Sequence, residues 1–129
     1  MLLFVSRFNP TTMSQVSIKR THNEVGFMRR NGFSNTVCNI DTNGPVITGK
    51  WGSLGFRVDM GERYPFKSPA IYISTITTYK SFYFKFGNLT ITVPGSDEQH
   101  FQVYIANWHP SVKLYELIKC IEKELTELN

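Results

Sequence analysis

The sequence lacks most features that mark exported, metal-binding or disulfide-rich proteins. It has two cysteines among 129 residues, Cys38 and Cys120, with no CxxC pair and no histidine-rich spacing around them. Neither a zinc site nor a secreted disulfide scaffold is indicated, and no cofactor is expected. A reducing compartment fits best, which means the cytoplasm and/or nucleus, or the host cytoplasm if the protein is viral.

Long apolar runs and biased segments are also missing. The only apolar run near the N-terminus, Leu2 to Val5, is much shorter than a secretory h-region or a membrane span, so we expect no membrane association. There is no internal repeat, no Ser/Gly/Pro-rich stretch and no run of single-sign charge. With 41% hydrophobic and 14% aromatic residues, the composition is that of one ordinary folded domain.

The formal net charge of +4 is distributed unevenly along the chain. Residues 1–64 carry eight Lys/Arg and four Asp/Glu, whereas residues 65–129 carry six of each. The excess lies chiefly at Lys19, Arg20, Arg29 and Arg30. Such a patch can attract nucleic acid or an acidic protein surface, but a solvated helix face is the commoner explanation. No nucleic-acid-binding motif accompanies it.

Two helices are predicted, one near each end of the chain. Residues 14–30 form the first, because apolar residues recur near one face and a glycine-containing turn, residues 31–33, follows. The second is clearer, since its apolar residues follow the i, i+3, i+4, i+7 spacing, and Ser111 is predicted as its N-cap. Its apolar residues are Leu114, Leu117, Ile118, Ile121 and Leu125.

Between the two predicted helices, apolar residues alternate with polar ones, which is the spacing typical of β-strands. The segments 36–40 and 45–51 flank the turn sequence "DTNG" and should pair as a hairpin, followed by strands over residues 55–60 and 70–74. A further hairpin is predicted around Gly87-Asn88. In its first strand, phenylalanines at 82, 84 and 86 are expected to face the domain, while Tyr83 and Lys85 face solvent.

These elements predict an α+β domain over residues 14–129, preceded by an N-terminal extension over residues 1–13. The architecture expected is an N-terminal helix, an antiparallel β-meander with an extra hairpin, and a C-terminal helix packed on the sheet.

Three stretches carry a resemblance to a known family. They are "IKRTHNEVGFMRR", residues 18–30, the connector "YPFKSPAIYI", residues 64–73, and "WHPSVKLYELIKCIEKEL", residues 108–125. They resemble the first helix, the Tyr-Pro-Phe-x-Pro-Pro motif and the Trp-x-Pro helix opening of ubiquitin-conjugating (UBC) proteins. Ser68 replaces the first of the paired prolines. The resemblance implies a UBC-like fold and transfer of ubiquitin through a cysteine thioester.

The catalytic part of that family's pattern is missing from this sequence. Eight residues before Trp108, where the family has its cysteine, stands His100, and no cysteine lies between Val93 and Trp108. The position of the family's His-Pro-Asn tripeptide reads Thr-Ile-Thr, residues 90–92. Because acyl-imidazoles hydrolyse readily, His100 would be a poor ubiquitin carrier. The sequence therefore predicts a protein that is not an enzyme.

A UBC-like chain without its cysteine resembles the ubiquitin-conjugating enzyme variants, which act by binding. The resemblance implies protein partners, either ubiquitin or a conjugating enzyme or ligase, which the chain would position. We predict partner-binding residues at the positions where members of the family contact their partners, and in the extra hairpin. They are Lys19, Arg20, Phe66, Lys67, Pro110, Ser111, Tyr83 and Lys85.

Three other interpretations stay open on sequence grounds. The first is an RWD-type scaffold domain, which has a similar proline-flanked connector and binds other proteins without a ubiquitin role. The second is an active conjugating enzyme that uses Cys120 or Cys38 as a displaced nucleophile. The third is a basic nucleic-acid module, whose binding would weaken steeply with salt.

Overall fold

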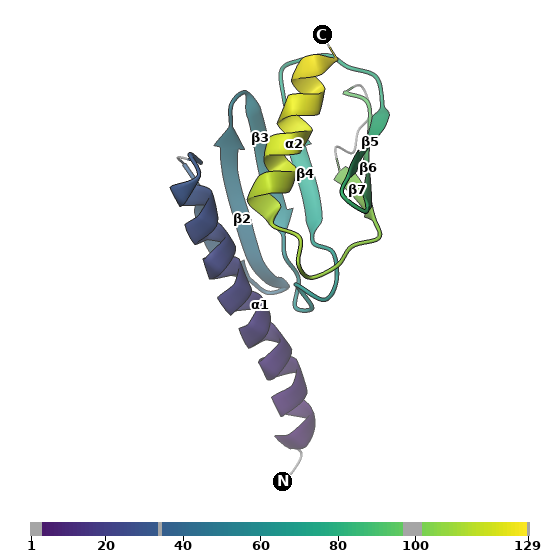
Figure 1. The fold of residues 1–129 in the computed structure, drawn as a ribbon. Coiled ribbons are helices and arrows are strands. Elements are labelled where there is room, and N and C mark those ends of the chain that lie inside the picture. Colours follow the sequence, from purple (N-terminus) through teal and green to yellow (C-terminus); the bar gives the residue numbers. More distant parts are fainter. Residues whose placement is uncertain (1–3, 34, 97–101, 129) are drawn as a thin grey trace.

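The computed structural model describes the chain over residues 4–33, 35–96 and 102–128, with side chains from residue 15 onward. Figure 1 shows two helices lying against a twisted sheet. In chain order the elements are α1 (Phe4–Arg30), β1 (Val37–Asp41), β2 (Gly44–Trp51), β3 (Leu54–Asp59), β4 (Ala70–Ser74), β5 (Phe82–Phe86), β6 (Leu89–Val93), β7 (Gln102–Ala106) and α2 (Leu114–Glu127).

The seven strands form one antiparallel sheet in the order β1-β2-β3-β4-β7-β6-β5. The predicted α+β class is confirmed, but a strand at residues 102–106 was not predicted. β7 pairs with β4 through Tyr72 opposite Gln102, and with β6 through Ile91 opposite Ile105. The predicted hairpin exists as β5 and β6, and β7 makes it a continuation of the main sheet.

One hydrophobic core lies between the helices and one face of the sheet. In register across four strands, Ile47, Val58, Ile71 and Val103 form a row of side chains that is 2% exposed or less. The predicted apolar stripe of α2 is buried in the same cluster, together with Val25 and Met28 of α1. As predicted, Phe84 is buried, and Phe82 and Phe86 are partly buried against the core.

The first helix ends at Arg30 as predicted, but the starts of both helices differ from the predictions. α1 begins at Phe4 rather than at Ser14, so the predicted boundary after residue 13 falls inside the helix, whose first turns extend past the sheet (Figure 1). α2 begins at Leu114, and its N-cap residue is Lys113, which makes no side-chain capping bond. The prediction of Ser111 as the cap is wrong. Its hydroxyl instead bonds His109 Nδ1 at 2.6 Å.

The strand alternation leaves the second face of the sheet uncovered among the described residues. We call it the open face. Over β4 to β7 it carries Tyr72, Tyr104, Tyr83 and Lys85, all exposed, whereas the apolar residues that alternate with them point to the core. The predicted solvent orientation of Tyr83 and Lys85 is confirmed.

Candidate functional site

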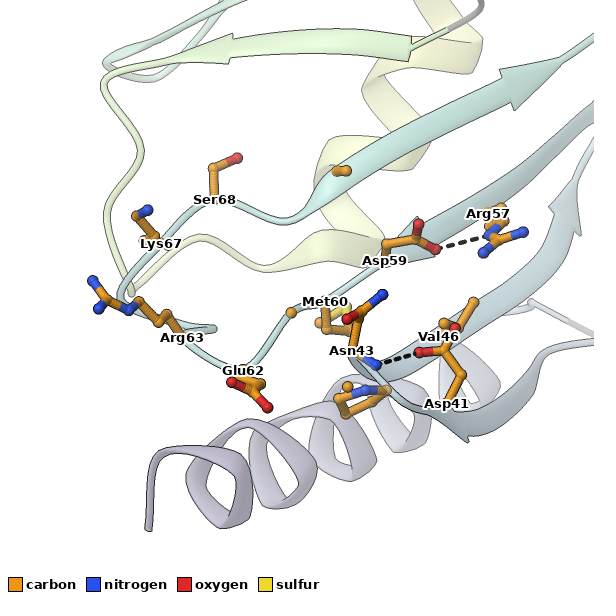
Figure 2. Close-up of a pocket in the computed structure, with 14 residues that line it drawn as sticks. Asp41, Asn43, Val46, Arg57, Asp59, Met60, Glu62, Arg63, Lys67 and Ser68 are labelled. Atoms are coloured by element: carbon orange, nitrogen blue, oxygen red, sulfur yellow. Dashed lines mark hydrogen bonds and ion pairs between the residues drawn. The ribbon is translucent and has the colours of Figure 1, made fainter. Parts of the chain in front are cut away.

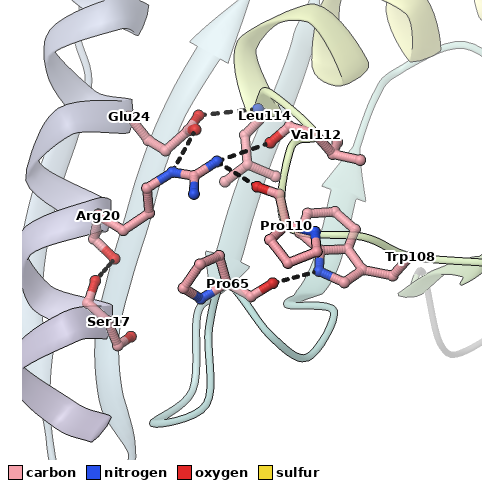
Figure 3. A network of polar contacts seen from close by, with 9 residues as sticks. Ser17, Arg20, Glu24, Pro65, Trp108, Pro110, Val112 and Leu114 are labelled. Carbon is pink, nitrogen blue, oxygen red and sulfur yellow. Dashed lines mark hydrogen bonds and ion pairs between the residues drawn. The ribbon is translucent and has the colours of Figure 1, made fainter. Parts of the chain in front are cut away.

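At one end of the sheet, a hydrogen bond and a ring contact join two loops. The connector between β3 and β4 contains the cis peptide bond Tyr64-Pro65, and the loop between β7 and α2 contains Trp108. The Trp108 Nε1–H donates to the Pro65 carbonyl oxygen at 2.8 Å (Figure 3). The Trp108 and Tyr64 rings lie 6.1 Å apart. The two loops are thereby fixed side by side.

Arg20 joins α1 to the same loops. Its guanidinium donates to the Pro110 carbonyl at 2.6 Å and to the Val112 carbonyl at 3.5 Å (Figure 3). The same guanidinium lies 5.8 Å from the centre of the Tyr64 ring. Its Nε also lies 3.6 Å from a carboxylate oxygen of Glu24. Arg20 was predicted to bind a partner, but most of its contacts join α1 to the β3–β4 connector and to the loop before α2.

Glu24 stands at the centre of this network and is 1% exposed. Its Oε2 accepts the backbone N–H of Leu114 at 2.9 Å, which supplies an acceptor to the first turn of α2 from another helix. Burial raises the pKa of the Glu24 carboxyl, against the lowering effects of the Leu114 bond and of Arg20. This carboxylate was not among the predicted site residues.

The Tyr64 hydroxyl is buried next to this network, close to the Glu24 carboxyl group, and the geometry of that approach falls short of a hydrogen bond. Burial, followed by the charge of Glu24, raises the pKa of the Tyr64 phenol. The phenol therefore stays protonated, and its ring packs between Arg20 and Trp108.

Around the network, the structure brings together five of the predicted partner-binding residues, which we call the end-loop surface. Phe66 is 60% exposed, and Lys67, Pro110 and Ser111 are also exposed. The end-loop surface consists of Arg20, Phe66, Lys67, Pro110 and Ser111.

The remaining predicted residues lie elsewhere. The buried positions of α1 include Ser17, Thr21 and Met28, and at about 100° per residue Lys19 points roughly opposite to them. Lys19 is exposed but does not share a side of the helix with Arg20. Tyr83 and Lys85 are on the open face in β5, where Lys85 Nζ donates to Thr90 Oγ1 at 2.8 Å.

A shallow pocket of about 540 Å³ lies beside the connector, between the β1–β2 turn and the end of β3 (Figure 2). Its lining has both signs of charge, and the Arg57–Asp59 ion pair of 2.8 Å occupies one side. It contains Lys67 of the end-loop surface, together with Glu62 and Arg63. Mixed charge does not select an ionic ligand of one sign, so the pocket is best regarded as a recess beside the end-loop surface.

Neither cysteine has the surroundings of a nucleophile. Cys38 is half-buried in the edge strand β1, and Cys120 is half-buried on α2. Burial is the main cause that raises the pKa of both thiols; Arg29 partly offsets it at Cys38, and Glu124 adds to it at Cys120. A raised pKa leaves little thiolate at neutral pH.

His100, at the position expected for the family's cysteine, lies outside the described residues. Within the described part of the chain, no cluster of three or more His, Cys, Asp or Glu side chains could hold a metal ion. The same part contains no helix long and apolar enough to cross a membrane.

Comparisons with known proteins give no further information about this site. No family model matches the sequence, and neither the curated proteins nor the solved structures give a match.

Sequence reasoning missed two groups of residues with functional potential. Glu24 had no local signal, because its partner Leu114 is distant in the sequence. Tyr104 and Tyr72 did have a local signal, because each alternates with Val or Ile residues that face the core. This pattern places the tyrosine on the outer face once the strand is recognised.

Proposed function

We propose that this chain is a catalytically inactive UBC-like interaction module, similar to the ubiquitin-conjugating enzyme variants. One observation carries the proposal: the three stretches that resemble the family, far apart in sequence, meet in one hydrogen-bonded network. Arg20 comes from the first stretch, Pro65 from the second, and Trp108 and Pro110 from the third. A resemblance by chance would not require these three segments to converge.

The chemistry of the cysteines supports a non-catalytic role. Thioester transfer requires an accessible thiolate, and burial disfavours the thiolate at both Cys38 and Cys120. Neither residue belongs to the end-loop surface. The sequence between Val93 and Trp108, where the family carries its nucleophile, has no cysteine.

The mechanism proposed is positioning. The end-loop surface presents the exposed Phe66 ring on a connector that is fixed by Trp108 and Arg20, so little conformational entropy is lost when a partner docks there. A docked ubiquitin, or a cysteine-bearing conjugating enzyme or ligase, would be held in a defined orientation. Alignment of this kind raises the rate of transfer without contributing a nucleophile.

The test combines activating enzyme, ATP and ubiquitin with this protein alone, and then with a panel of cysteine-bearing conjugating enzymes, on non-reducing gels. We expect no thioester on this protein, and faster chain formation with one particular conjugating enzyme. The Phe66→Ala variant should lose that acceleration. Ile76→Ala, which removes a 97% exposed side chain from another loop, is the matched control and should retain it.

Two outcomes would overturn the proposal. A thioester that disappears on replacing Cys120 or Cys38 would make the protein an active enzyme. No acceleration with any conjugating enzyme, and no binding of ubiquitin by nuclear magnetic resonance titration, would favour the RWD-type scaffold.

A further inference from the structure

The open face carries a row of exposed tyrosines that the proposed function does not use. Tyr72, Tyr104 and Tyr83 are 37%, 56% and 73% exposed. Tyr83 and Tyr104 both lie opposite Thr92 of the strand between them, which separates them by about 10 Å. Tyr72 lies opposite Gln102, so Tyr104 is its diagonal neighbour at about 7 Å. The three rings therefore cross four adjacent strands.

Positive charges flank the row at both ends. Arg57 lies directly opposite Tyr72 on the neighbouring strand, and Lys85 lies two residues after Tyr83 in the same strand. The described open face of β4 to β7 has no acidic side chain and no aliphatic side chain larger than alanine. Asp59 of β3 is the nearest acid in register, and it is paired with Arg57 at 2.8 Å.

A groove of about 350 Å³ lies beside Tyr72 on this face. Gly55 forms part of its floor, and a side chain there would collide with Ser74 Oγ, because an added Cβ would stand 2.6 Å from that atom. Lys50 and Arg57 line the groove together with Tyr72. A ring, the cation Lys50, which is unpaired within the described part of the chain, and a floor without a side chain suit a planar base with its phosphate; the Arg57 charge is already compensated by Asp59.

From this arrangement we infer that the open face binds single-stranded nucleic acid, RNA or DNA. One base enters the groove against Tyr72, with its phosphate near Lys50, and further bases stack on Tyr104 and Tyr83. Exposed rings accept any base because every base has a π-face, and cations that flank the rings attract the backbone.

The chemistry of the face favours this partner over a protein. The described open face of β4 to β7 carries Lys85 and no acidic side chain, and Thr92 and Gln102 between the rings offer hydrogen bonds, a combination that suits a polyanion with stacking bases. The face is also distinct from the end-loop surface, so the inference does not depend on the proposed function.

The test is fluorescence anisotropy of the full chain with labelled single strands of about 12 nucleotides, oligo(U) and oligo(dT), and with a duplex of equal length. We expect saturable binding of a single strand that is tighter than binding of the duplex. Tyr83→Thr and Tyr104→Thr keep residues suited to strands and should each weaken binding about 5-fold or more. Comparison of the two single strands identifies the preferred sugar.

A second pair of variants tests whether binding depends on the cations of the open face or only on the net positive charge of the protein. Affinity should fall with salt between about 50 and 200 mM, and Lys50→Gln should reduce the slope of log affinity against log salt by about 0.7. The control, Lys19→Gln, removes the same charge from α1 and should leave the slope unchanged. Circular dichroism melts verify that each variant is folded.

The inference is overturned by any of three results: no binding at ~100 µM protein, equal binding of the duplex, or affinity that is insensitive to both tyrosine variants. Failure of this experiment leaves the conjugation assay unaffected, because the variants used in the two experiments lie on different surfaces.

Discussion

Replacing Glu24 tests whether its carboxylate supports the start of α2. Glu24→Ala removes the carboxylate oxygen that accepts the Leu114 N–H, and a buried donor without an acceptor costs about 1–3 kcal/mol. The ion pair with Arg20 adds at most about 1 kcal/mol, because Arg20 is partly exposed and keeps its two carbonyl acceptors. Relief of the buried charge offsets part of this loss. The net expectation is a decrease of about 2 kcal/mol in the free energy of unfolding.

Urea unfolding followed by the fluorescence of Trp51 and Trp108 measures this change. Glu24→Gln keeps an acceptor oxygen of the same reach, so it should cost clearly less than Glu24→Ala. The exposed Glu62→Ala is the control and should change the free energy by less than about 0.5 kcal/mol. Equal losses for Glu24→Ala and Glu62→Ala would refute the capping argument.

The pH dependence of the same variants tests the electrostatics of Glu24. Burial raises its pKa above the ordinary value of 4.5, so the folded state holds the proton more tightly than the unfolded state. The contribution of Glu24 to stability is thus complete below pH 4.5 and is lost as the pH rises through the folded-state pKa. The stability of the wild type relative to Glu24→Gln should therefore be greater near pH 4 than near pH 7. A difference that grows with pH would mean that its hydrogen bonds outweigh its desolvation.

Three other predictions concern packing and reactivity. Gly44→Ala should destabilise the fold by more than about 1 kcal/mol, because its φ is +119° and an added Cβ would stand 3.0 Å from neighbouring backbone; Gly87→Ala, with φ +60° and open space, should cost less in the same urea titration. Trp108→Phe should cost about 1 kcal/mol by removing its hydrogen bond to the connector, and a loss below about 0.3 kcal/mol would contradict a holding role for that bond. Cys38 and Cys120 should react with a disulfide reagent more slowly than a free thiol at pH 8, and rates equal to the free thiol would contradict their raised pKa values.

Local patterns were sufficient to predict most elements of the fold. The "DTNG" turn forms as expected, with the Asn43 N–H donating to Asp41 Oδ1 at 2.8 Å, and the alternation of Phe84 with Tyr83 fixed the faces of the second hairpin. The helical spacing of the apolar residues was sufficient to predict α2, because the apolar side of this helix is also the side that is buried. These features depend on neighbours within a few residues.

The parts that could not be predicted depend on contacts between distant residues. β7 is a short strand whose partners are β4 and β6, and the side on which it joins the sheet appears only in the tertiary structure. The start of α2 is supported by Glu24 instead of the local Ser111. The end-loop residues were predicted singly, but their meeting depends on bonds such as that between Arg20 and Pro110.

The central position of β7 also orders the events of folding. Strands β1 to β4 can pair as a local meander, but the edge of β4 stays unpaired until residues 102–106 have been synthesised. Because the β5–β6 hairpin lies between β4 and β7 in the chain, that pairing joins residues distant in sequence and raises the contact order of the sheet. During this interval Ile71 and Ile73 belong to an open edge strand that another chain could pair with. Protection of the nascent chain from aggregation therefore depends on how fast β7 docks.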